Sequence, residues 1–388
     1  MDRPDTPIYF DTAATTRVDS EVVAVMTEAL AAAHRFANPS SAHGLGQQAS
    51  LAVAQARAAV AAELGCVVDE VVFTSGATES INLALQGIAL AHADRGRHLV
   101  TTRIEHQATL ACCAHLETLG FEVTYLSPGG DGVVAADRVA QALRPDTLLL
   151  SVMHTNNETG AMQPIDAIAA IAAEQGVLLH VDAAQAAGKF RIDLDEVPID
   201  LLSLSAHKFH GPKGVGCLVI RDRPRLRLRP LTFGGGQEFG LRPGTLPTHQ
   251  VLGLAKALTL AAQRRQADLE HVAVLKAQCI EQLGARLDLH IHGAPDRTSP
   301  YILNFAVPGI RSDALMNQTA DAVAIASGAA CSAGTVEPSR VLRAMGIDGD
   351  ALYGAVRVSF DRTHTADDIA VLVNAIIAAV QRIQELDA

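Results

Sequence analysis

Between residues 70 and 220 the chain alternates short apolar runs with longer segments of helical periodicity. The apolar runs predict strands at 70–76, 98–102, 122–127, 147–153, 178–183, 201–207 and 216–220. Most of the segments between them predict helices, at 79–96, 108–120, 135–145 and 164–176. Gly96, Gly120 and Gly176 stand where glycines commonly end helices. Apolar strands that alternate with helices predict a mostly parallel sheet covered by helices on both faces.

The pattern changes after about residue 250. Residues 249–287 have the periodicity of one long helix or of two helices in series, and strand-like runs follow at 301–307 and 355–360. A last helical segment covers 365–386, where Thr365 and Asp368 have the spacing of a capping box. We therefore expect an α/β protein with a second, smaller α+β domain.

The composition is that of a folded globular protein, and it limits the classes of partner that the protein is expected to bind. Of the 388 residues, 49% are hydrophobic and 19% are charged. The formal net charge of −11 argues against a general nucleic-acid binder. We find no signal-peptide core and no uncharged apolar run of about 18 residues, so we expect a cytoplasmic protein with no membrane partner. Five alternating arginines in 221–230 are interpreted as the solvent face of a strand, ahead of a dock for an acidic partner.

Polar residues follow five of the predicted strands. Residues 75–78 would present backbone N–H groups to an anion at a helix start, and His106, Asn157, Asp182 and Lys208 follow later strands. Each has an ordinary explanation, such as a helix cap or a surface charge. Because ligands of such sheets bind beyond the carboxyl ends of the strands, we expect these residues to converge. An anion nest, an imidazole, an amide, a carboxylate and a lysine are together the groups that pyridoxal phosphate requires.

Eight motifs carry a resemblance to a known family. They are "FTSGATES" (73–80), "EH" (105–106), "NNETG" (156–160), "HVDAAQ" (180–185), "SAHKFHGPKGVG" (205–216), "GGGQE" (234–238), "RPGTLP" (242–247) and "SGAACSAGTVEPSRVLRAMG" (327–346). With them, the chain resembles the cysteine desulfurases of the NifS/IscS type, which are class V aminotransferase-like, fold-type I pyridoxal-phosphate enzymes. The resemblance implies a large cofactor-binding domain over 17–255, and a small domain made of 1–16 with 256–388.

The resemblance also implies a role for each candidate residue. Lys208 would bond to pyridoxal phosphate, Asp182 would pair with the ring nitrogen, and His106 would stack on the ring and act in acid–base steps. Phosphate contacts are implied for Ala77, Thr78, Ser205 and His207, and for Thr245 of a second subunit. Contacts with the ring oxygen or the substrate are implied for Gln185, Asn157, Asn38 and Arg357, of which Arg357 would bind the substrate carboxylate.

Cys331 differs from the other five cysteines. It lies among small residues and glycine, whereas the other cysteines lie in apolar stretches, at 66, 112, 113, 217 and 279. Local sequence alone leaves it between a nucleophile on a mobile loop and an exposed spectator thiol. The resemblance implies that the Cys331 thiolate takes the sulfur of L-cysteine as a persulfide, with release of L-alanine, and passes it to an acceptor.

The resemblance implies the partners as well. They are a sulfur-acceptor or iron–sulfur scaffold protein and a second copy of the chain in a homodimer. No resident metal is implied, and any contact of Cys331 with an iron–sulfur cluster would be transient. The chain stops at "RIQELDA", short of the longer tail of housekeeping members, which indicates a dedicated or accessory sulfur supplier.

Other interpretations remain open at this point. They are a selenocysteine lyase, a class V aminotransferase without sulfur transfer, a cofactor-fold protein that serves as a binding platform, and a metal site at His207 and His210. Two residues depart from the family pattern. Phe239 stands where we expect arginine, and Pro243 where we expect serine.

Overall fold

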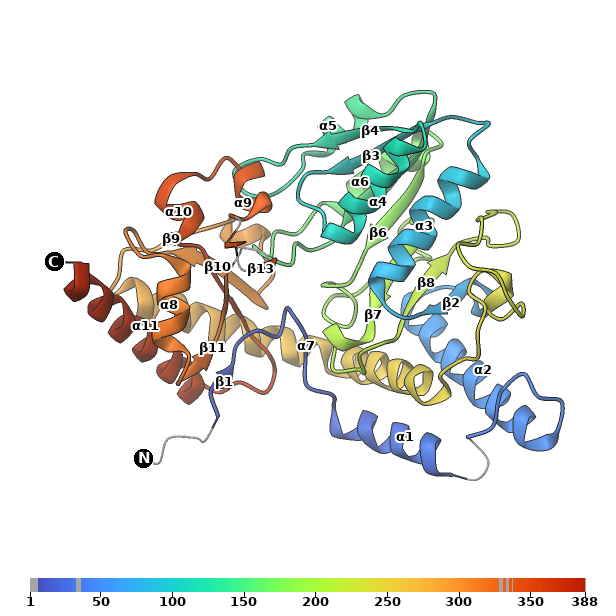
Figure 1. The fold of residues 1–388 in the computed structure, drawn as a ribbon, viewed down its shortest axis with the longest axis horizontal. Helices are drawn as coiled ribbons and strands as arrows, with labels where there is room; N and C mark the ends of the chain where they lie inside the picture. Colours follow the sequence, from blue (N-terminus) through green and yellow to red (C-terminus); the bar gives the residue numbers. More distant parts are fainter. Residues whose placement is uncertain (1–5, 33–35, 328–330, 333–334, 337, 388) are drawn as a thin grey trace.

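The computed structural model describes residues 6–32, 36–327, 331–332, 335–336 and 338–387 (Figure 1). At 331, 332, 335, 336 and 387 it describes the backbone alone. Two sheets, each packed against helices, lie side by side, and the long helix α7 runs past both (Figure 1).

The larger sheet has seven strands in the order β2-β8-β7-β6-β5-β3-β4. The strand β8 is antiparallel to both of its neighbours, and the remaining pairs are parallel. The strands are β2 (Val71–Thr74), β3 (His98–Thr102), β4 (Glu122–Leu126), β5 (Thr147–Met153), β6 (Leu178–Asp182), β7 (Leu201–Ser205) and β8 (Gly216–Ile220). Each coincides with a predicted strand, and the predicted fold class is confirmed.

Helices cover both faces of this sheet. One face packs against α3 (Ala77–Ala91) and α4 (Gln107–Thr118). The other face packs against α2, α5, α6 and the first half of α7, and α1 lies against α7. Their bounds are α1 (Ser20–Ala31), α2 (Gly44–Leu64), α5 (Ala136–Ala142), α6 (Ile165–Glu174) and α7 (Thr248–Gly284). The sheet is therefore buried on both faces, which explains why its strands are apolar without alternation.

The smaller sheet is antiparallel, in the order β12-β15-β10-β9. Two short pairs accompany it, β1 with β11 and β13 with β14. The strands are β1 (Ile8–Tyr9), β9 (His290–Ile291), β10 (Ile302–Ala306), β11 (Val323–Ala324), β12 (Ala326–Ser327), β13 (Cys331–Ser332), β14 (Thr335–Val336) and β15 (Val356–Ser359). The helices of this half are α8 (Ser312–Thr319), α9 (Arg340–Ala344), α10 (Gly349–Tyr353) and α11 (Ala366–Asp387). Short 3-10 turns are η1 (Val68–Glu70), η2 (Ala206–Lys208), η3 (Glu238–Gly240) and η4 (Pro295–Arg297).

The helix α7 joins two separate hydrophobic cores. Its first half contributes Val251 and Leu258 to the core of the large sheet, and its second half contributes Leu275 and Leu283 to the core of the small sheet. Of the two predicted alternatives for 249–287, the single long helix is confirmed.

The helix α11 closes the small core. Its segment Ala366–Leu386 is long and apolar enough to cross a membrane. However, its apolar stripe, which includes Ile369, Leu372 and Ile376, is buried against the small sheet and α7. The predicted capping box is confirmed, because the Asp368 N–H donates to Thr365 Oγ1 at 3.2 Å and the Thr365 N–H donates to Asp368 Oδ2 at 2.8 Å.

Two local predictions are wrong. The helix α3 ends at Ala91, so Gly96 does not end it. Glycine is instead required there because a Cβ would lie 2.2 Å from the carbonyl oxygen of Asp146. The arginine-rich segment 221–230 forms turns rather than a strand. Three of its arginines have separate local partners, because Arg221 pairs with Glu70, Arg223 donates to the Asp69 carbonyl oxygen and Arg225 pairs with Asp222. The alternation in sequence therefore does not reflect a pleated face.

Candidate functional site

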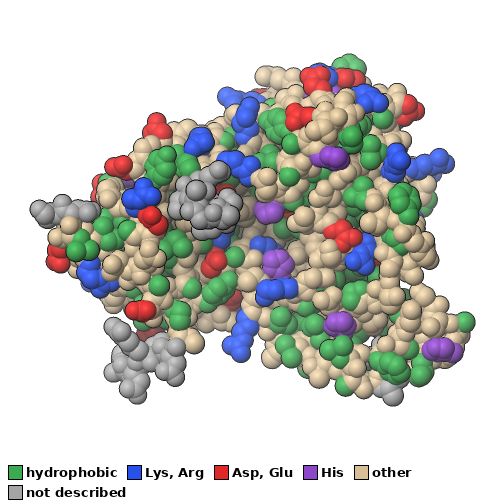
Figure 2. Space-filling model, viewed as in Figure 1, with side chains coloured by type: hydrophobic (Ala, Val, Ile, Leu, Met, Phe, Trp, Pro, Cys, Tyr) green, Lys and Arg blue, Asp and Glu red, His purple; other side chains and the backbone are tan. Residues whose placement is uncertain are grey.

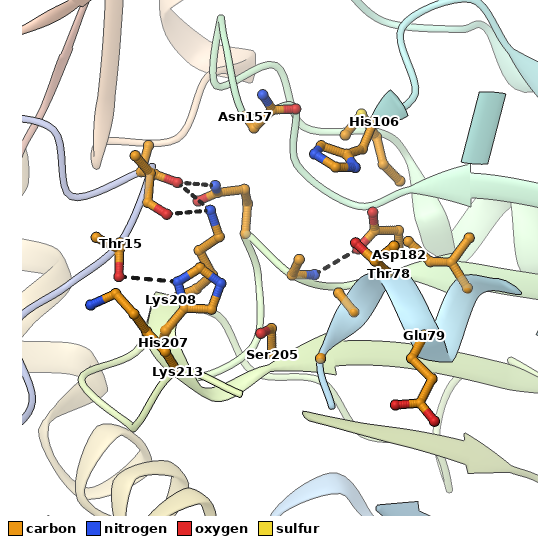
Figure 3. A pocket seen from close by; sticks show the side chains of 18 of the residues that line it. Thr15, Thr78, Glu79, His106, Asn157, Asp182, Ser205, His207, Lys208 and Lys213 are labelled. Carbon is orange, nitrogen blue, oxygen red and sulfur yellow. Dashed lines mark hydrogen bonds between the residues drawn. The ribbon is translucent and has the colours of Figure 1, made fainter. Parts of the chain in front are cut away.

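A cavity of about 640 Å³ lies beyond the carboxyl ends of the parallel strands. Strand register produces the convergence, because Asp182 at the end of β6 aligns with Met153 of β5 on one side and Ser203 of β7 on the other. Ten of the predicted site residues line this cavity, namely Ala77, Thr78, His106, Asn157, Asp182, Gln185, Ser205, His207, Lys208 and Arg357 (Figure 3). Histidine side chains gather near the centre of the face drawn in Figure 2.

Lys208 enters the cavity from η2, directly after β7. Its Nζ donates hydrogen bonds to the carbonyl oxygens of Ala13 at 2.6 Å and Ala14 at 2.9 Å (Figure 3). Burial, with a smaller effect of the nearby Arg357, lowers the pKa of Lys208 to about 8, although Asp182 opposes this shift. The lysine is therefore partly neutral near neutral pH, which is the form that reacts with an aldehyde.

Asp182 and His106 lie near Lys208 around one open space (Figure 3). Asp182 is 4% exposed, and its Oδ1 accepts a hydrogen bond from the Ala184 N–H at 2.9 Å. Burial raises the pKa of Asp182, while His106 and Lys208 counteract this shift. Such a carboxylate is ready to pair with a cationic ligand group.

His106 is the N-cap of α4, where its Nδ1 accepts a hydrogen bond from the Ala108 N–H at 3.1 Å. This contact assigns the remaining ring hydrogen to Nε2. Burial lowers the pKa of His106, so the imidazole is held in its neutral form. A neutral, oriented ring can stack on a flat ligand and can also exchange a proton.

The start of α3 forms an anion-binding cradle. Gly76 has a φ of 152° and leads into the first helical N–H groups, those of Ala77 and Thr78, which have no partner within the helix. Glycine suits this position because residues with a side chain rarely adopt such a φ, and the Ser205 hydroxyl lies beside it, 3.4 Å from where a Cβ would be. The His207 ring contacts Thr15 Oγ1 at 3.1 Å, and burial lowers the pKa of His207 to about 4.

Arg357 reaches the cavity from β15 of the small sheet. It pairs with Asp11 Oδ1 at 2.6 Å and donates to the Asn157 carbonyl oxygen at 2.7 Å. Its buried Nε has no hydrogen-bond partner among the described residues. The Asp11 and Asn157 contacts fix the orientation of the guanidinium and use one N–H group of each terminal nitrogen, so each of these nitrogens has a second N–H group for a ligand. This contact was not predicted from the sequence, because the two residues are 346 positions apart.

The loop that carries "GGGQE" is anchored by a buried ion pair. Arg57 and Glu238 lie 2.5 Å apart, and Glu238 also accepts a hydrogen bond from the Phe73 N–H at 2.6 Å. Phe239, with a φ of 60°, lies under the Arg223 guanidinium, whose carbon is 3.6 Å from the ring centroid. An aromatic residue therefore fits this position between arginines, which accounts for one departure from the family pattern.

Two predicted site residues, Asn38 and Thr245, lie apart from the others within one chain. Asn38 and Thr245 line a separate hollow of about 360 Å³, and the Asn38 side chain accepts a hydrogen bond from the Ser40 N–H at 2.9 Å. The Cys331 side chain lies outside the described residues. The Cys331 backbone belongs to β13, five positions after Ala326, which pairs with Arg357.

The histidines considered as metal ligands do not share a site. His207 faces the cavity, whereas the His210 ring contacts the Arg17 carbonyl oxygen at 3.0 Å and Asp361 at 3.2 Å. The two imidazoles are thus engaged by different partners.

Comparison with known proteins agrees with this geometry. The family model described as "Aminotransferase class-V" matches residues 8–372. A protein of Pseudomonas putida (strain W619), "Cysteine desulfurase IscS", is 41% identical over 98% of this chain and 94% of its own length. A solved "NIFS-LIKE PROTEIN" superposes with a TM-score of 0.90 at 35% identity, over 97% of this chain and 100% of that one. A structure described as "SspA in complex with cysteine" superposes with a TM-score of 0.82 at 38% identity, over 92% and 100% of the two chains.

Proposed function

Because this chain belongs to the class-V aminotransferase family and is a cysteine desulfurase that uses pyridoxal phosphate, we propose that Lys208, Asp182, His106 and Cys331 carry out its reaction. L-Cysteine is the substrate, and L-alanine and a persulfide on Cys331 are the products. The observation that supports this assignment most is the convergence of Lys208, Asp182 and His106 on one cavity beside the N-terminus of α3.

The residues present fit the cofactor. The N–H groups of Ala77 and Thr78 with the Ser205 hydroxyl suit a phosphate, and the buried Asp182 suits a protonated ring nitrogen. The cofactor, when bound, supplies an electron-poor ring that stabilises negative charge at the substrate Cα.

Lys208 and His106 move protons. With its pKa lowered to about 8, Lys208 has a neutral fraction that can accept the Cα proton near neutral pH. The neutral His106, whose Nε2 carries the hydrogen, can donate this proton to the substrate and then regain a proton from solvent. Arg357 would hold the substrate carboxylate through the remaining N–H groups of its terminal nitrogens, while Asp11 and the Asn157 carbonyl fix the guanidinium.

Cys331 accepts the sulfur. Its thiolate attacks the substrate sulfur, so an S–S bond forms as the C–S bond breaks. The electron pair of the broken bond remains on carbon, which then takes a proton, and alanine leaves. The overall change, thiol plus cysteine to persulfide plus alanine, balances without an external oxidant.

The other cysteines are poor candidates for this step. Cys112, Cys113, Cys217 and Cys279 are buried, and burial raises the pKa of each thiol. Burial likewise raises the pKa of the half-buried Cys66 to about 12.

Several further properties belong to the proposal. The persulfide is passed to an acceptor protein in iron–sulfur cluster assembly or another sulfur-transfer pathway, in the cytoplasm. A homodimer would bring Thr245 to the phosphate of the partner's site, and Asn38 beside it would approach the same site. We also retain the division into a large domain over 17–255 and a small domain of 1–16 with 256–388.

One assay tests the proposal. The purified protein, loaded with pyridoxal phosphate, is incubated with L-cysteine and a reductant, and alanine and sulfide are measured together. Equal amounts are expected, and Cys331→Ala is expected to abolish both while leaving the bound cofactor in place. A class V aminotransferase would not depend on Cys331, and a selenocysteine lyase would act on selenocysteine but not on cysteine. Either pattern would contradict the proposed reaction.

A further inference from the structure

Lys189 is a buried lysine that the reaction above does not use. It is 9% exposed, and its Nζ donates a hydrogen bond to Gln185 Oε1 at 3.0 Å. The same nitrogen lies 5.4 Å from the centroid of the Tyr301 ring. Among the described residues, no carboxylate forms an ion pair with it. Burying an ammonium costs free energy, so an unpaired buried lysine calls for an explanation.

The partner of Lys189 is a residue of the site. Gln185 is 3% exposed and lines the cavity, and its Nε2 donates to the Ala13 carbonyl oxygen at 2.8 Å. The same oxygen accepts a hydrogen bond from Lys208 Nζ at 2.6 Å. A continuous series of contacts therefore runs from Lys189 through Gln185 and Ala13 to Lys208.

The two contacts of Gln185 hold both ends of its amide. A lysine nitrogen is a donor here, so it fixes Oε1, and a carbonyl oxygen is only an acceptor, so it fixes Nε2. Nε2 has two hydrogens, of which Ala13 takes one. The second is the hydrogen that Gln185 can offer to a ligand in the cavity. If Lys189 were removed, Gln185 Oε1 would be a buried acceptor without a partner. Because such an acceptor costs free energy, the amide would be expected to rotate out of its present orientation.

We propose that Lys189 is a positioning residue that holds the Gln185 amide so that its NH2 group donates a hydrogen bond to the ring oxygen of bound pyridoxal phosphate. The inference rests on the proposed function, since that cofactor supplies the acceptor. The ring oxygen is anionic, and a fixed donor beside it stabilises the negative charge.

Charged groups around Lys189 affect this arrangement. Burial lowers the pKa of Lys189 to about 7. The positive charges of Lys208 and Arg357 contribute to this shift, and Asp361 opposes it. Both lysines also line a small cavity of about 20 Å³ whose other titratable and charged groups are His210, Asp268, Tyr301, Asp361 and Arg362. The nitrogen of a lysine carries hydrogens in its neutral and its charged form, so the hydrogen bond to Gln185 persists across this titration.

The test is a pH titration of the visible absorption band of the cofactor-loaded protein without substrate. The band reports protonation of the Lys208 nitrogen that is joined to the cofactor. In Lys189→Met the lost donor to the ring oxygen favours the protonated form. The midpoint is expected to rise by about one pH unit, and Lys189→Arg, which retains a donor, to remain closer to wild type.

A matched control is Lys276→Met. Lys276 is also a lysine whose pKa burial lowers to about 8, but it donates to Thr298 Oγ1 and the Ser299 carbonyl oxygen outside the cavity. Its replacement is expected to lower the melting temperature and to leave the midpoint unchanged. A purely structural role of Lys189 would give the same result as this control, and that result would overturn the inference.

A double-mutant cycle adds a second criterion. If Lys189 acts through Gln185, then Lys189→Met produces no further shift in a Gln185→Leu background. Additive shifts would overturn the inference. If Lys189→Met does not fold, Gln185→Leu alone is the test. An unchanged midpoint in Gln185→Leu would show that the Gln185 amide does not donate to the ring oxygen, and this result would overturn the inference. A wild-type protein that takes up no coloured cofactor would instead contradict the proposed function itself.

Discussion

The reactivity of Lys208 with pH offers a sharp test of the electrostatics of the site. Burial and the nearby Arg357 both lower the pKa of Lys208, from the ordinary lysine value of 10.5 to about 8. The perturbation is Arg357→Met, which removes the cation and keeps an apolar side chain in its place. The pKa of Lys208 is then expected to rise, because the charged form of the lysine loses a repulsive neighbour.

The size of the effect follows from the two pKa values. At pH 7 a lysine with a pKa near 8 is neutral in about one molecule in ten, whereas one at 10.5 is neutral in about one in three thousand. The site therefore increases the reactive form about 300-fold at neutral pH. Each unit by which Arg357→Met raises the pKa is expected to reduce that form about tenfold at pH 7.

Competitive labelling measures this directly. Cofactor-free protein is treated with a trace of acetic anhydride between pH 6 and pH 11, beside free Nα-acetyl-lysine, and acetylation of Lys208 is read by peptide mass spectrometry. The midpoint of labelling is expected near pH 8 in wild type and at a higher pH in Arg357→Met. Arg311→Met, which removes an exposed arginine paired with Asp313, serves as the control. A wild-type curve that still rises at pH 10, or a lower midpoint in Arg357→Met, would refute the reasoning.

Two further predictions concern buried groups. Arg57→Met leaves Glu238 buried without its counterion and is expected to lower the free energy of unfolding in urea by about 3–5 kcal/mol, whereas Arg191→Met, which breaks an exposed ion pair, should cost far less. Equal losses would contradict this account of the loop. Burial raises the pKa of Glu105 from 4.5 to about 8, so the folded protein retains a proton that the unfolded chain releases. The contribution of Glu105 to stability is therefore expected to be lost as pH rises from about 5 to 8, and Glu105→Gln should remove this contribution in urea titrations repeated at several pH values; a pH dependence that Glu105→Gln leaves unchanged would exclude it.

The sequence predicted the large sheet well for a physical reason. Strands buried on both faces are continuous apolar runs, and each run here is followed by a polar residue at the strand end, such as Asp182 after 178–181. The alternation of arginines at 221–230 led to a wrong prediction of a strand. This segment begins with turns and contains no strand, and Arg223 stacks on Phe239.

Contacts between distant parts of the chain could not be predicted in the same way. Asp11 fixes Arg357 across most of the sequence, and no local pattern marks such a pair. Lys189 lies four positions after Gln185 and was overlooked for a different reason. A lysine after a glycine suggests a surface charge, and only the packing around it shows that it is buried.

The central claim is that Cys331 receives the sulfur of L-cysteine, and a single-turnover experiment tests it most directly. The loaded enzyme is mixed with one equivalent of L-cysteine in the absence of reductant, and its cysteine peptides are mapped by mass spectrometry while alanine is quantified. One added sulfur atom on the Cys331 peptide per alanine is the predicted result. Alanine formed with no added sulfur on Cys331, or with the sulfur on another cysteine, would contradict the account.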